Sequence, residues 1–163
     1  MPKLKISLDS ASLDKTLNDL EEYRKKVESL GERVVKRLTE DGVKQAQDYA
    51  MYMNAYDSGE LVSGIVAEYS GDKGYIHSTA PHTAFVEMGT GVVGARNPNT
   101  NGTNPVGWEG YDIHGHGDSG WNYPGKDGKW HWTKGMPSRP FMYDTAQTIR
   151  QAIPVIVEDE LKK

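Results

Sequence analysis

Hydrophobic residues recur at intervals of three and four over the first third of the chain. This spacing places one apolar stripe along a helix whose other faces are charged, and it predicts a long helix over residues 12–53. Gly31 and Gly42 interrupt the pattern. Glycine costs about 1 kcal/mol relative to alanine inside a helix, so a bend or a break near Gly31 is left open. The stripe either packs on a sheet or contacts another subunit. Its members are Leu13, Leu17, Leu20, Val27, Leu30, Val34, Leu38, Val43, Ala46 and Ala50.

Three further segments have the pattern of β-strands. Residues 3–9 alternate strictly between polar and apolar positions, which is the period of a half-buried strand. Residues 61–69 are rich in branched side chains, and residues 75–79 return after a hairpin-type connection at residues 71–74. We therefore expect a small, mostly antiparallel sheet.

A short helix and a C-terminal helix complete the regular elements. Pro81 suits the first turn of a helix at residues 81–88, and the glycines that follow permit the chain to leave it. Helical periodicity resumes after Pro140, and Pro154 is expected to end or kink that last helix. The length of the chain predicts a single domain over residues 1–163.

The segment between residues 91 and 135 differs from the rest of the chain, because all four tryptophans fall in it among many glycines. Only residues 128–133 alternate as a strand does. Such a long connection inside a compact domain is usually functional or disordered, and its aromatic residues argue against plain disorder. We interpret it as a loop insertion that binds a partner. The candidate partner-binding residues are Trp108, Tyr111, Trp121, Tyr123, Trp130 and Trp132.

Composition narrows the classes of function. The net charge is -4 with both signs mixed, which argues against tight binding to duplex DNA. No cysteine is present, so disulfides and thiolate metal sites are excluded. Apolar runs are shorter than the roughly 20 residues of a membrane helix, and no secretory signal is expected. Hydrophobic residues make up only 36% and the mean hydropathy is -0.69, so subunit contacts are expected to add stability.

The candidate chemistry is sparse. His114 and His116, with His131, form the arrangement closest to a metal site, but a polar glycine-rich loop with incidental histidines accounts for them as well. Glu87 has no triad, HExxH motif or phosphate-binding loop beside it, so we expect no catalysis, no metal and no other cofactor. Glu87 is instead expected to accept hydrogen bonds from Arg139 or from loop backbone amides, tying two segments together.

Two short motifs and a turn carry a resemblance to a known family. The first motif is Phe85-Val86-Glu87-Met88-Gly89-Thr90-Gly91. The second is Gly135-Met136-Pro137-Ser138-Arg139-Pro140-Phe141-Met142, and the turn is Asp57-Ser58-Gly59-Glu60-Leu61. In this order they resemble the small head–tail joining proteins of long-tailed bacteriophages, also called tail-completion or neck proteins. The turn departs from the family pattern, because it lacks the usual proline and has glutamate where a basic residue is usual.

The resemblance implies an α+β fold with a long N-terminal helix, a small, mostly antiparallel sheet and a C-terminal helix packed beside it. It also implies a structural virion protein rather than an enzyme. Such a protein forms a homo-oligomeric ring, hexameric or dodecameric, between the phage connector and the tail tube. DNA passes through the ring without specific binding, and assembly takes place in the host cytoplasm. The motif residues are expected to define the fold. They are Asp57, Gly59, Leu61, Phe85, Glu87, Gly89, Thr90, Gly91, Arg139, Pro140 and Phe141.

Two other classes of function remain open. Trp121, Tyr123, Trp130 and Trp132 suit a carbohydrate-binding module, because indole and phenol rings stack on sugar faces. A zinc-dependent hydrolase built on His114 and His116 is the other class. Each differs from the joining role in an observable way, since one implies glycan affinity and the other implies bound zinc.

Overall fold

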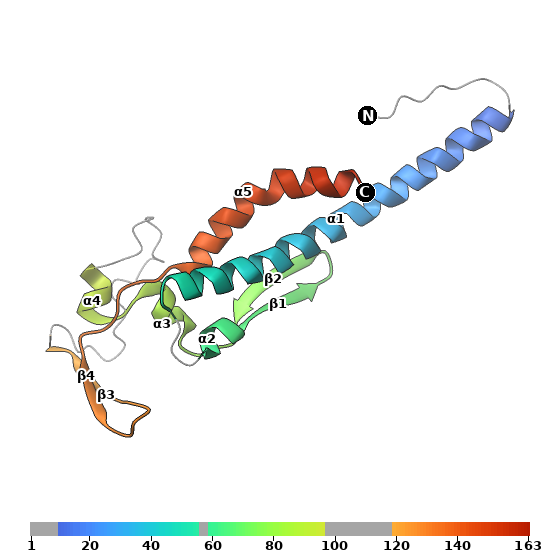
Figure 1. Ribbon diagram of the computed structural model, residues 1–163. Coiled ribbons are helices and arrows are strands. Elements are labelled where there is room, and N and C mark those ends of the chain that lie inside the picture. The colour runs from blue at the N-terminus through green and yellow to red at the C-terminus, as the bar shows by residue number, and fades with distance from the viewer. Residues whose placement is uncertain (1–9, 56–58, 97–118) are drawn as a thin grey trace.

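The protein folds as an α+β structure in which one long helix is the spine (Figure 1). The structure is a computed structural model, and it describes residues 10–55, 59–96 and 119–163. The predicted fold class is confirmed, whereas the predicted strand at residues 3–9 and Asp57 lie outside the described residues. The elements are α1 (Ser10–Tyr52), α2 (Glu60–Ser63), β1 (Ile65–Ser70), β2 (Lys73–Ser78), α3 (Thr83–Met88), α4 (Gly91–Arg96), β3 (Trp121–Pro124), β4 (Trp130–Thr133) and α5 (Phe141–Leu161).

Helix α1 is continuous through both of its interior glycines, so no break occurs near Gly31. A Cβ atom at Gly31 would meet nothing within 4 Å, because this turn faces solvent. Gly42 is buried, and a Cβ atom there would meet the side chains of Ile76 and Ile149. Gly42 therefore lies where β2 and α5 approach the spine closely.

The predicted strand at residues 61–69 starts later than expected, because its first part is the helical turn α2. Gly59 before this turn adopts a left-handed conformation with φ 82°. The side-chain amide of Gln47 on α1 donates to the carbonyl oxygens of Val62 and Ile65. Branched residues suit either a strand or a buried helical turn, and this contact with α1 stabilises the turn.

Strands β1 and β2 form the predicted antiparallel hairpin. Its register pairs Ile65 with Ser78 at one end and Ser70 with Lys73 at the other. The hairpin packs along α1, so closely that a Cβ atom at Gly74 would meet the Thr39 side chain. One face of this small sheet is therefore covered by the spine.

Helix α5 lies beside α1 and runs through Pro154 to Leu161, so of the two predicted outcomes, an end or a kink at Pro154, the end does not occur. Figure 1 shows that α5 bends along its length. Proline removes one helical hydrogen bond, and packing on α1 beyond it compensates. Ile156, two residues after the proline, is only 4% exposed.

A cluster of charges fixes the last turn of α5 on α1. Glu160 is 3% exposed and accepts from Arg33 at 3.2 Å and from Arg37 at 3.4 Å. A hydrogen bond from Lys163, followed by those from the two arginines, holds the pKa of Glu160 below its ordinary value. Glu160 is therefore ionised and paired, which is how a buried carboxylate is tolerated.

The core lies where α1, α2 and α3 meet the first residue of α5. Alanines are frequent in it, so the helix backbones approach one another closely. The buried apolar residues of this cluster are Ala46, Ala50, Ala55, Leu61, Ile65, Ala80, Val86 and Phe141.

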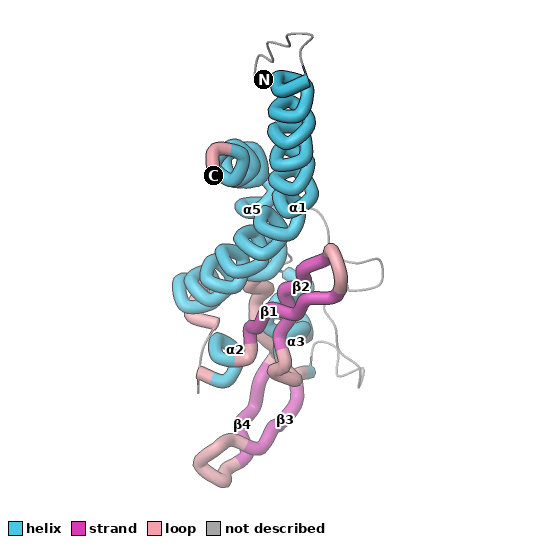
Figure 2. Tube along the Cα trace, turned by 90° about the vertical axis from the view of Figure 1, so that its right-hand side faces the viewer, coloured by secondary structure: helices cyan, strands magenta, loops and turns pink. Residues whose placement is uncertain are grey.

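The insertion at residues 91–135 contains more regular structure than its sequence predicts. It opens with α4, and β3 and β4 form a second antiparallel hairpin that projects from the body (Figure 2). The strand predicted at residues 128–133 is confirmed as β4, whereas β3 was not predicted because Asn122 and Pro124 are poor strand formers. Four residues singled out from the sequence lie outside the described residues, namely Trp108, Tyr111, His114 and His116.

Candidate interaction site

Glu87 joins the two sequence motifs by accepting two backbone hydrogen bonds from the start of α5. Its Oε2 accepts from the N–H of Met142 and its Oε1 from the N–H of Tyr143, each at 2.9 Å. The first N–H groups of a helix have no partner within the helix and carry partial positive charge. The prediction that Glu87 ties the two motifs together is confirmed, but the donors are amides in the first turn of α5 rather than loop amides.

The alternative partner of Glu87, the Arg139 side chain, is not the one used. The Arg139 guanidinium lies 3.9 Å from the sulfur of Met136, and its backbone N–H donates to the carbonyl oxygen of Val86 at 2.9 Å. The helix amides take the place of the guanidinium because α5 begins only two residues after Arg139. Arg139 therefore connects the motifs through its backbone.

Burial raises the pKa of Glu87 above its ordinary value of 4.5. The two bonds from the Met142 and Tyr143 amides act in the opposite direction, and the nearby Asp144 carboxylate adds to the rise. Loss of water around the carboxylate outweighs the two amide bonds, because desolvation penalises the charged form. The junction thus contains a carboxylate whose charge state depends on pH.

A short backbone bridge continues the contact between the motifs. The N–H of Thr90 donates to the carbonyl oxygen of Met136 at 2.9 Å, and the N–H of Met136 donates back to Thr90 at 3.2 Å. The Ser138 hydroxyl donates to the carbonyl oxygen of Glu87 at 2.6 Å. We call residues 85–91 and 135–143, joined in this way, the motif junction.

Two glycines of the motif junction leave no room for a side chain. Gly89 has φ 76°, and a Cβ atom there would lie 2.7 Å from the Ser138 nitrogen and 2.9 Å from the Met136 oxygen. Gly135 has φ 101°, and its Cβ atom would meet the carbonyl group of Thr90. Both positions combine a left-handed backbone with close approach, which glycine alone accommodates.

The other described motif residues occupy structural positions. Phe141 is fully buried at 0% exposure, and Leu61 is buried at 1%. Phe85 is half-buried on α3, and Pro140 precedes the first residue of α5. These positions fit residues that define the fold rather than residues that contact a ligand.

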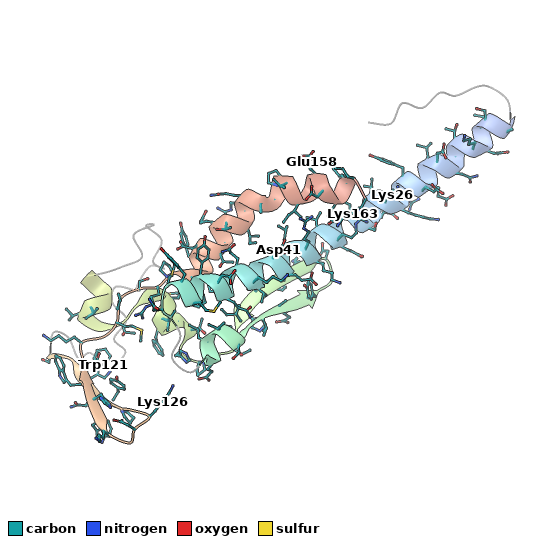
Figure 3. The ribbon with its side chains drawn as sticks, in the orientation of Figure 1. Lys26, Asp41, Trp121, Lys126, Glu158 and Lys163 are labelled. Carbon is teal, nitrogen blue, oxygen red and sulfur yellow. The ribbon has the colours of Figure 1, made fainter. Side chains whose placement is uncertain are left out.

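The hairpin of β3 and β4, residues 121–133, carries most of the described aromatic residues that were singled out; we call it the aromatic hairpin. Trp130 is 71% exposed, Trp132 is 58% exposed and Tyr123 is 46% exposed. Trp130 and Trp132 are two residues apart on one strand, so they share a face. Figure 3 places Trp121 and Lys126 at this end of the molecule, far from Lys26 on α1.

Polar contacts within the aromatic hairpin fix its shape. The Asp127 carboxylate lies 2.9 Å from Nε2 of His131, and the His131 ring lies 5.7 Å from the Tyr123 ring. The hydrogen bond with His131 lowers the pKa of Asp127. On the other face, the Lys134 ammonium lies 5.6 Å from the centre of a Trp132 ring, within cation–π range.

Trp121 connects the aromatic hairpin to the motif junction. It is half-buried at the base of the hairpin, paired with Thr133. A Cβ atom on Gly91 would lie 2.8 Å from its indole ring, so the ring packs directly over that glycine. The N–H of Val93 also donates to the carbonyl oxygen of Lys134 at 3.2 Å. The hairpin is therefore anchored at its base and exposed along its length.

Within residues 10–55, 59–96 and 119–163, no group of three or more histidine, aspartate or glutamate side chains is arranged to hold a metal ion. His131, the candidate third ligand, pairs with Asp127. Among the described helices, none is long and apolar enough to cross a membrane.

Sequence reasoning missed the contribution of the start of α5 and of Ser138. The Pro-Ser-Arg-Pro segment at residues 137–140, followed by an apolar helical pattern, indicates the start of a helix. The first N–H groups of such a helix can donate hydrogen bonds to a carboxylate. Comparison with known proteins adds nothing to the assignment, since no family model, no curated protein and no solved structure matches this chain.

Proposed function

We propose that this protein is a structural head–tail joining protein of a long-tailed bacteriophage, assembled as a ring between the connector and the tail tube. One observation carries the proposal: exposed apolar surfaces lie at opposite ends of an elongated molecule. The aromatic hairpin lies at one end and the N-terminal half of α1 at the other (Figure 1). A joining protein must contact two neighbours at once, and this arrangement meets that requirement.

The motif junction supports the proposal in a second way. Two residues that carry the family resemblance, Thr90 and Gly91, lie at the base of the aromatic hairpin, where Thr90 bonds to Met136 and Gly91 packs under Trp121. A hairpin of two strands is only marginally stable alone, so its base has to be fixed if it is to present its rings in one orientation. Tryptophan and tyrosine are the residues that most often anchor protein interfaces.

The charge of the chain suits a ring through which DNA moves. The net charge is -4, and several basic residues on α1 and after the end of α5 are paired with acidic ones, as in Arg37–Asp41 and Lys162–Glu158. A lumen without a positive field does not retain the phosphate backbone. Under this proposal the protein is located at the head–tail interface of the virion.

Carbohydrate binding is the second candidate, and a specific observation favours it. Trp130 and Trp132 expose their rings on one face of the aromatic hairpin, next to the Lys134 ammonium. Such a face can stack on a sugar ring. The two functions differ in their partner, since a carbohydrate-binding module requires no phage component.

The test is incorporation of the purified protein into isolated connectors and tail tubes, imaged by negative-stain microscopy. We expect an added ring at the end of the particles. The double substitution Trp130→Ala and Trp132→Ala is expected to abolish incorporation, whereas Tyr69→Ala, which removes another half-exposed aromatic ring on β1, is the matched control and is expected to leave it unchanged.

Failure of the wild-type protein to join either particle would contradict the joining role. Binding to a glycan array at increasing protein concentration distinguishes the carbohydrate-binding function from the joining role. Saturable glycan binding that the tryptophan variant loses and the Tyr69 variant retains, without incorporation into particles, would establish the carbohydrate-binding function instead.

A further inference from the structure

The N-terminal half of α1 exposes an apolar stripe that the described chain leaves uncovered. Leu13 is 43% exposed, Leu17 is 63% exposed and Leu20 is 46% exposed. Val27 continues the same face at 47% exposure. This part of α1 projects beyond the end of α5 (Figure 1). We call these four residues the helix stripe.

An acidic row borders the helix stripe on one side. Asp14, Glu21 and Glu28 follow one another at intervals of seven residues, so they lie along one edge of the helix. Asp14 and Glu21 have no ion-pair partner among the described residues, whereas Glu28 accepts from Arg24 at 2.7 Å. A partner of the helix stripe would therefore be apolar with a positive charge at its edge.

The body of the protein contains a groove with that character. It lies between α5 and β2, has a volume of about 360 Å³ and is lined mainly by Ile76, Met142, Ala146, Ile149 and Ile153. The four α5 residues recur at intervals of four, three and four, so they form a second apolar stripe beside the one that packs on α1. We call this the α5 groove.

Arg150 is the charged residue in the lining of the α5 groove. It is exposed, and none of the ion pairs formed within the described part of the chain includes it. Other arginines of the body, such as Arg33 and Arg37, are paired with acidic residues. The α5 groove thus offers one unpaired cation to an incoming acidic edge.

Residues 1–9 are too short to reach from Ser10 to the α5 groove of their own chain. Gly42, whose Cβ position contacts Ile76 and Ile149, lies about 48 Å along α1 from Ser10 at 1.5 Å per residue. Residues 1–9 span about 30 Å even when fully extended. The helix stripe itself is part of the same rigid helix, so it stays at a fixed distance from the groove.

We propose that the helix stripe of one copy docks in the α5 groove of a second copy, with the acidic row facing Arg150. The contact is heterologous, because two different surfaces of the chain meet. Repeated contacts of this kind close into a ring or continue as a filament, depending on the rotation between copies. The inference rests on the assembly role proposed above and specifies the subunit contact of that assembly.

The test uses two full-length variants that block one surface each. Leu17→Glu disables the helix stripe and Ile153→Glu disables the α5 groove; both side chains are substantially exposed, so the fold is expected to survive, which circular dichroism checks. Lys26→Glu and Val155→Glu are the matched controls, since each places a glutamate on the opposite face of the same helix.

Sedimentation velocity over a range of concentrations is the measurement. The wild-type protein and both controls are expected to self-associate. Each blocking variant alone is expected to associate at least about tenfold more weakly, which corresponds to 1.4 kcal/mol. An equal mixture of the two is expected to form dimers and nothing larger, because one intact stripe then meets one intact groove.

Three results would overturn the inference. If Ile153→Glu associates like the wild type while Leu17→Glu does not, the stripes pair with each other. If Leu17→Glu associates normally and Ile153→Glu does not, a different segment fills the groove. If the wild-type protein remains monomeric at its highest soluble concentration, the contact does not form. In each case incorporation into phage particles can still succeed, so the joining role is judged separately.

Discussion

The two halves of α1 have the same hydrophobic spacing but opposite environments. In the C-terminal half, Ala46 and Ala50 are fully buried at 0% exposure under α5 and the β1–β2 hairpin. In the N-terminal half, the leucines of the helix stripe are between 43% and 63% exposed. The buried half is built from small residues that permit close approach, whereas the exposed half presents large ones.

The difference teaches that periodicity identifies an apolar face but not what covers it. From the sequence, the apolar stripe of α1 is compatible both with packing on a sheet and with contact to another subunit. The C-terminal half packs on β1, β2 and α5 within the chain. For the N-terminal half, coverage by a second copy is the proposal made above. If the difference in exposure reflects a difference in packing energy, substitutions in the two halves should change the free energy of unfolding by different amounts.

The largest effect is expected from Phe141→Ala, which removes a fully buried ring from the core beneath the C-terminal half of α1. The substitution should reduce the free energy of unfolding by about 3–5 kcal/mol, because the cavity adds to the lost burial. Leu20→Ala in the helix stripe should change it by less than about 0.5 kcal/mol in dilute protein. Urea unfolding of both variants measures the two changes in unfolding free energy. Equal losses of stability would contradict the inferred difference in packing between the two halves of α1.

The second effect concerns Glu87→Gln in the motif junction. A protonated glutamate keeps a lone pair on its hydroxyl, whereas a glutamine nitrogen cannot accept a hydrogen bond. One amide of α5 is therefore left unpaired, at a cost of about 1–3 kcal/mol near pH 4. Glu21→Gln, which changes an exposed carboxylate of the N-terminal half, is the control and should be neutral.

The pH dependence of the Glu87 effect has a definite sign. The folded state raises the pKa of Glu87 above 4.5, so the folded state binds the proton more tightly than the unfolded state. The stability contributed by Glu87 is thus fully present at pH values below the pKa of an unfolded glutamate. It is lost as the pH rises through the higher pKa that Glu87 has in the folded state. The gap in unfolding free energy between wild type and Glu87→Gln should narrow from about pH 4 to pH 7; a gap that widens would contradict the raised pKa.

The two interior glycines of α1 provide a third, smaller contrast. Gly31→Ala should stabilise the protein by about 0.5–1 kcal/mol, because alanine favours the helix and nothing lies within 4 Å of its methyl group. Gly42→Ala forces the Ile76 side chain to move. The resulting strain should cost at least about 1 kcal/mol and so offset the gain in helix propensity. Thermal unfolding distinguishes them, and equal gains would mean that the buried half is loosely packed.

The smallest effect is expected from Glu28→Gln, which removes the ion pair with Arg24 in the N-terminal half. Both side chains are more than half exposed, so the loss should be about 0.3–0.5 kcal/mol and should disappear in high salt. Melting temperatures at low and high ionic strength provide the measurement. A large effect that survives in salt would show that this half of the helix is not simply solvated in the free protein.

Much of the fold followed from local patterns. The extent of α1, the β1–β2 hairpin, α3 and the start of α5 at Phe141 were all predictable, because each depends on spacing and turn residues nearby in sequence. The α2 turn was not, since Gln47 on a distant helix stabilises it. Strand β3 was missed because Trp-Asn-Tyr-Pro has little strand propensity and depends on its pairing with β4.

The candidate site was predictable in part. The sequence predicts that Glu87 joins the two motifs, but it does not specify which N–H groups donate hydrogen bonds to the carboxylate. A guanidinium such as that of Arg139 can be identified as a donor from the sequence. The amides of Met142 and Tyr143 can be identified only when the structure places the start of α5 beside α3. The α5 groove gave no signal, because its lining joins one strand residue to a helix far away in the chain.

The motif junction also has a consequence for the order in which the nascent chain matures. Its two sides are separated by 55 residues between Glu87 and Met142, and the Glu160 contact with Arg33 spans 127 residues. Synthesis proceeds from the N-terminus, so α1, the β1–β2 hairpin and the aromatic hairpin leave the ribosome before α5. The Glu87 carboxylate and the Arg33 guanidinium therefore meet their partners only after α5 has been made. A ribosome-bound chain that still lacks α5 leaves the side of α1 that packs on it uncovered, so the body of the protein is completed by a segment made after the aromatic hairpin.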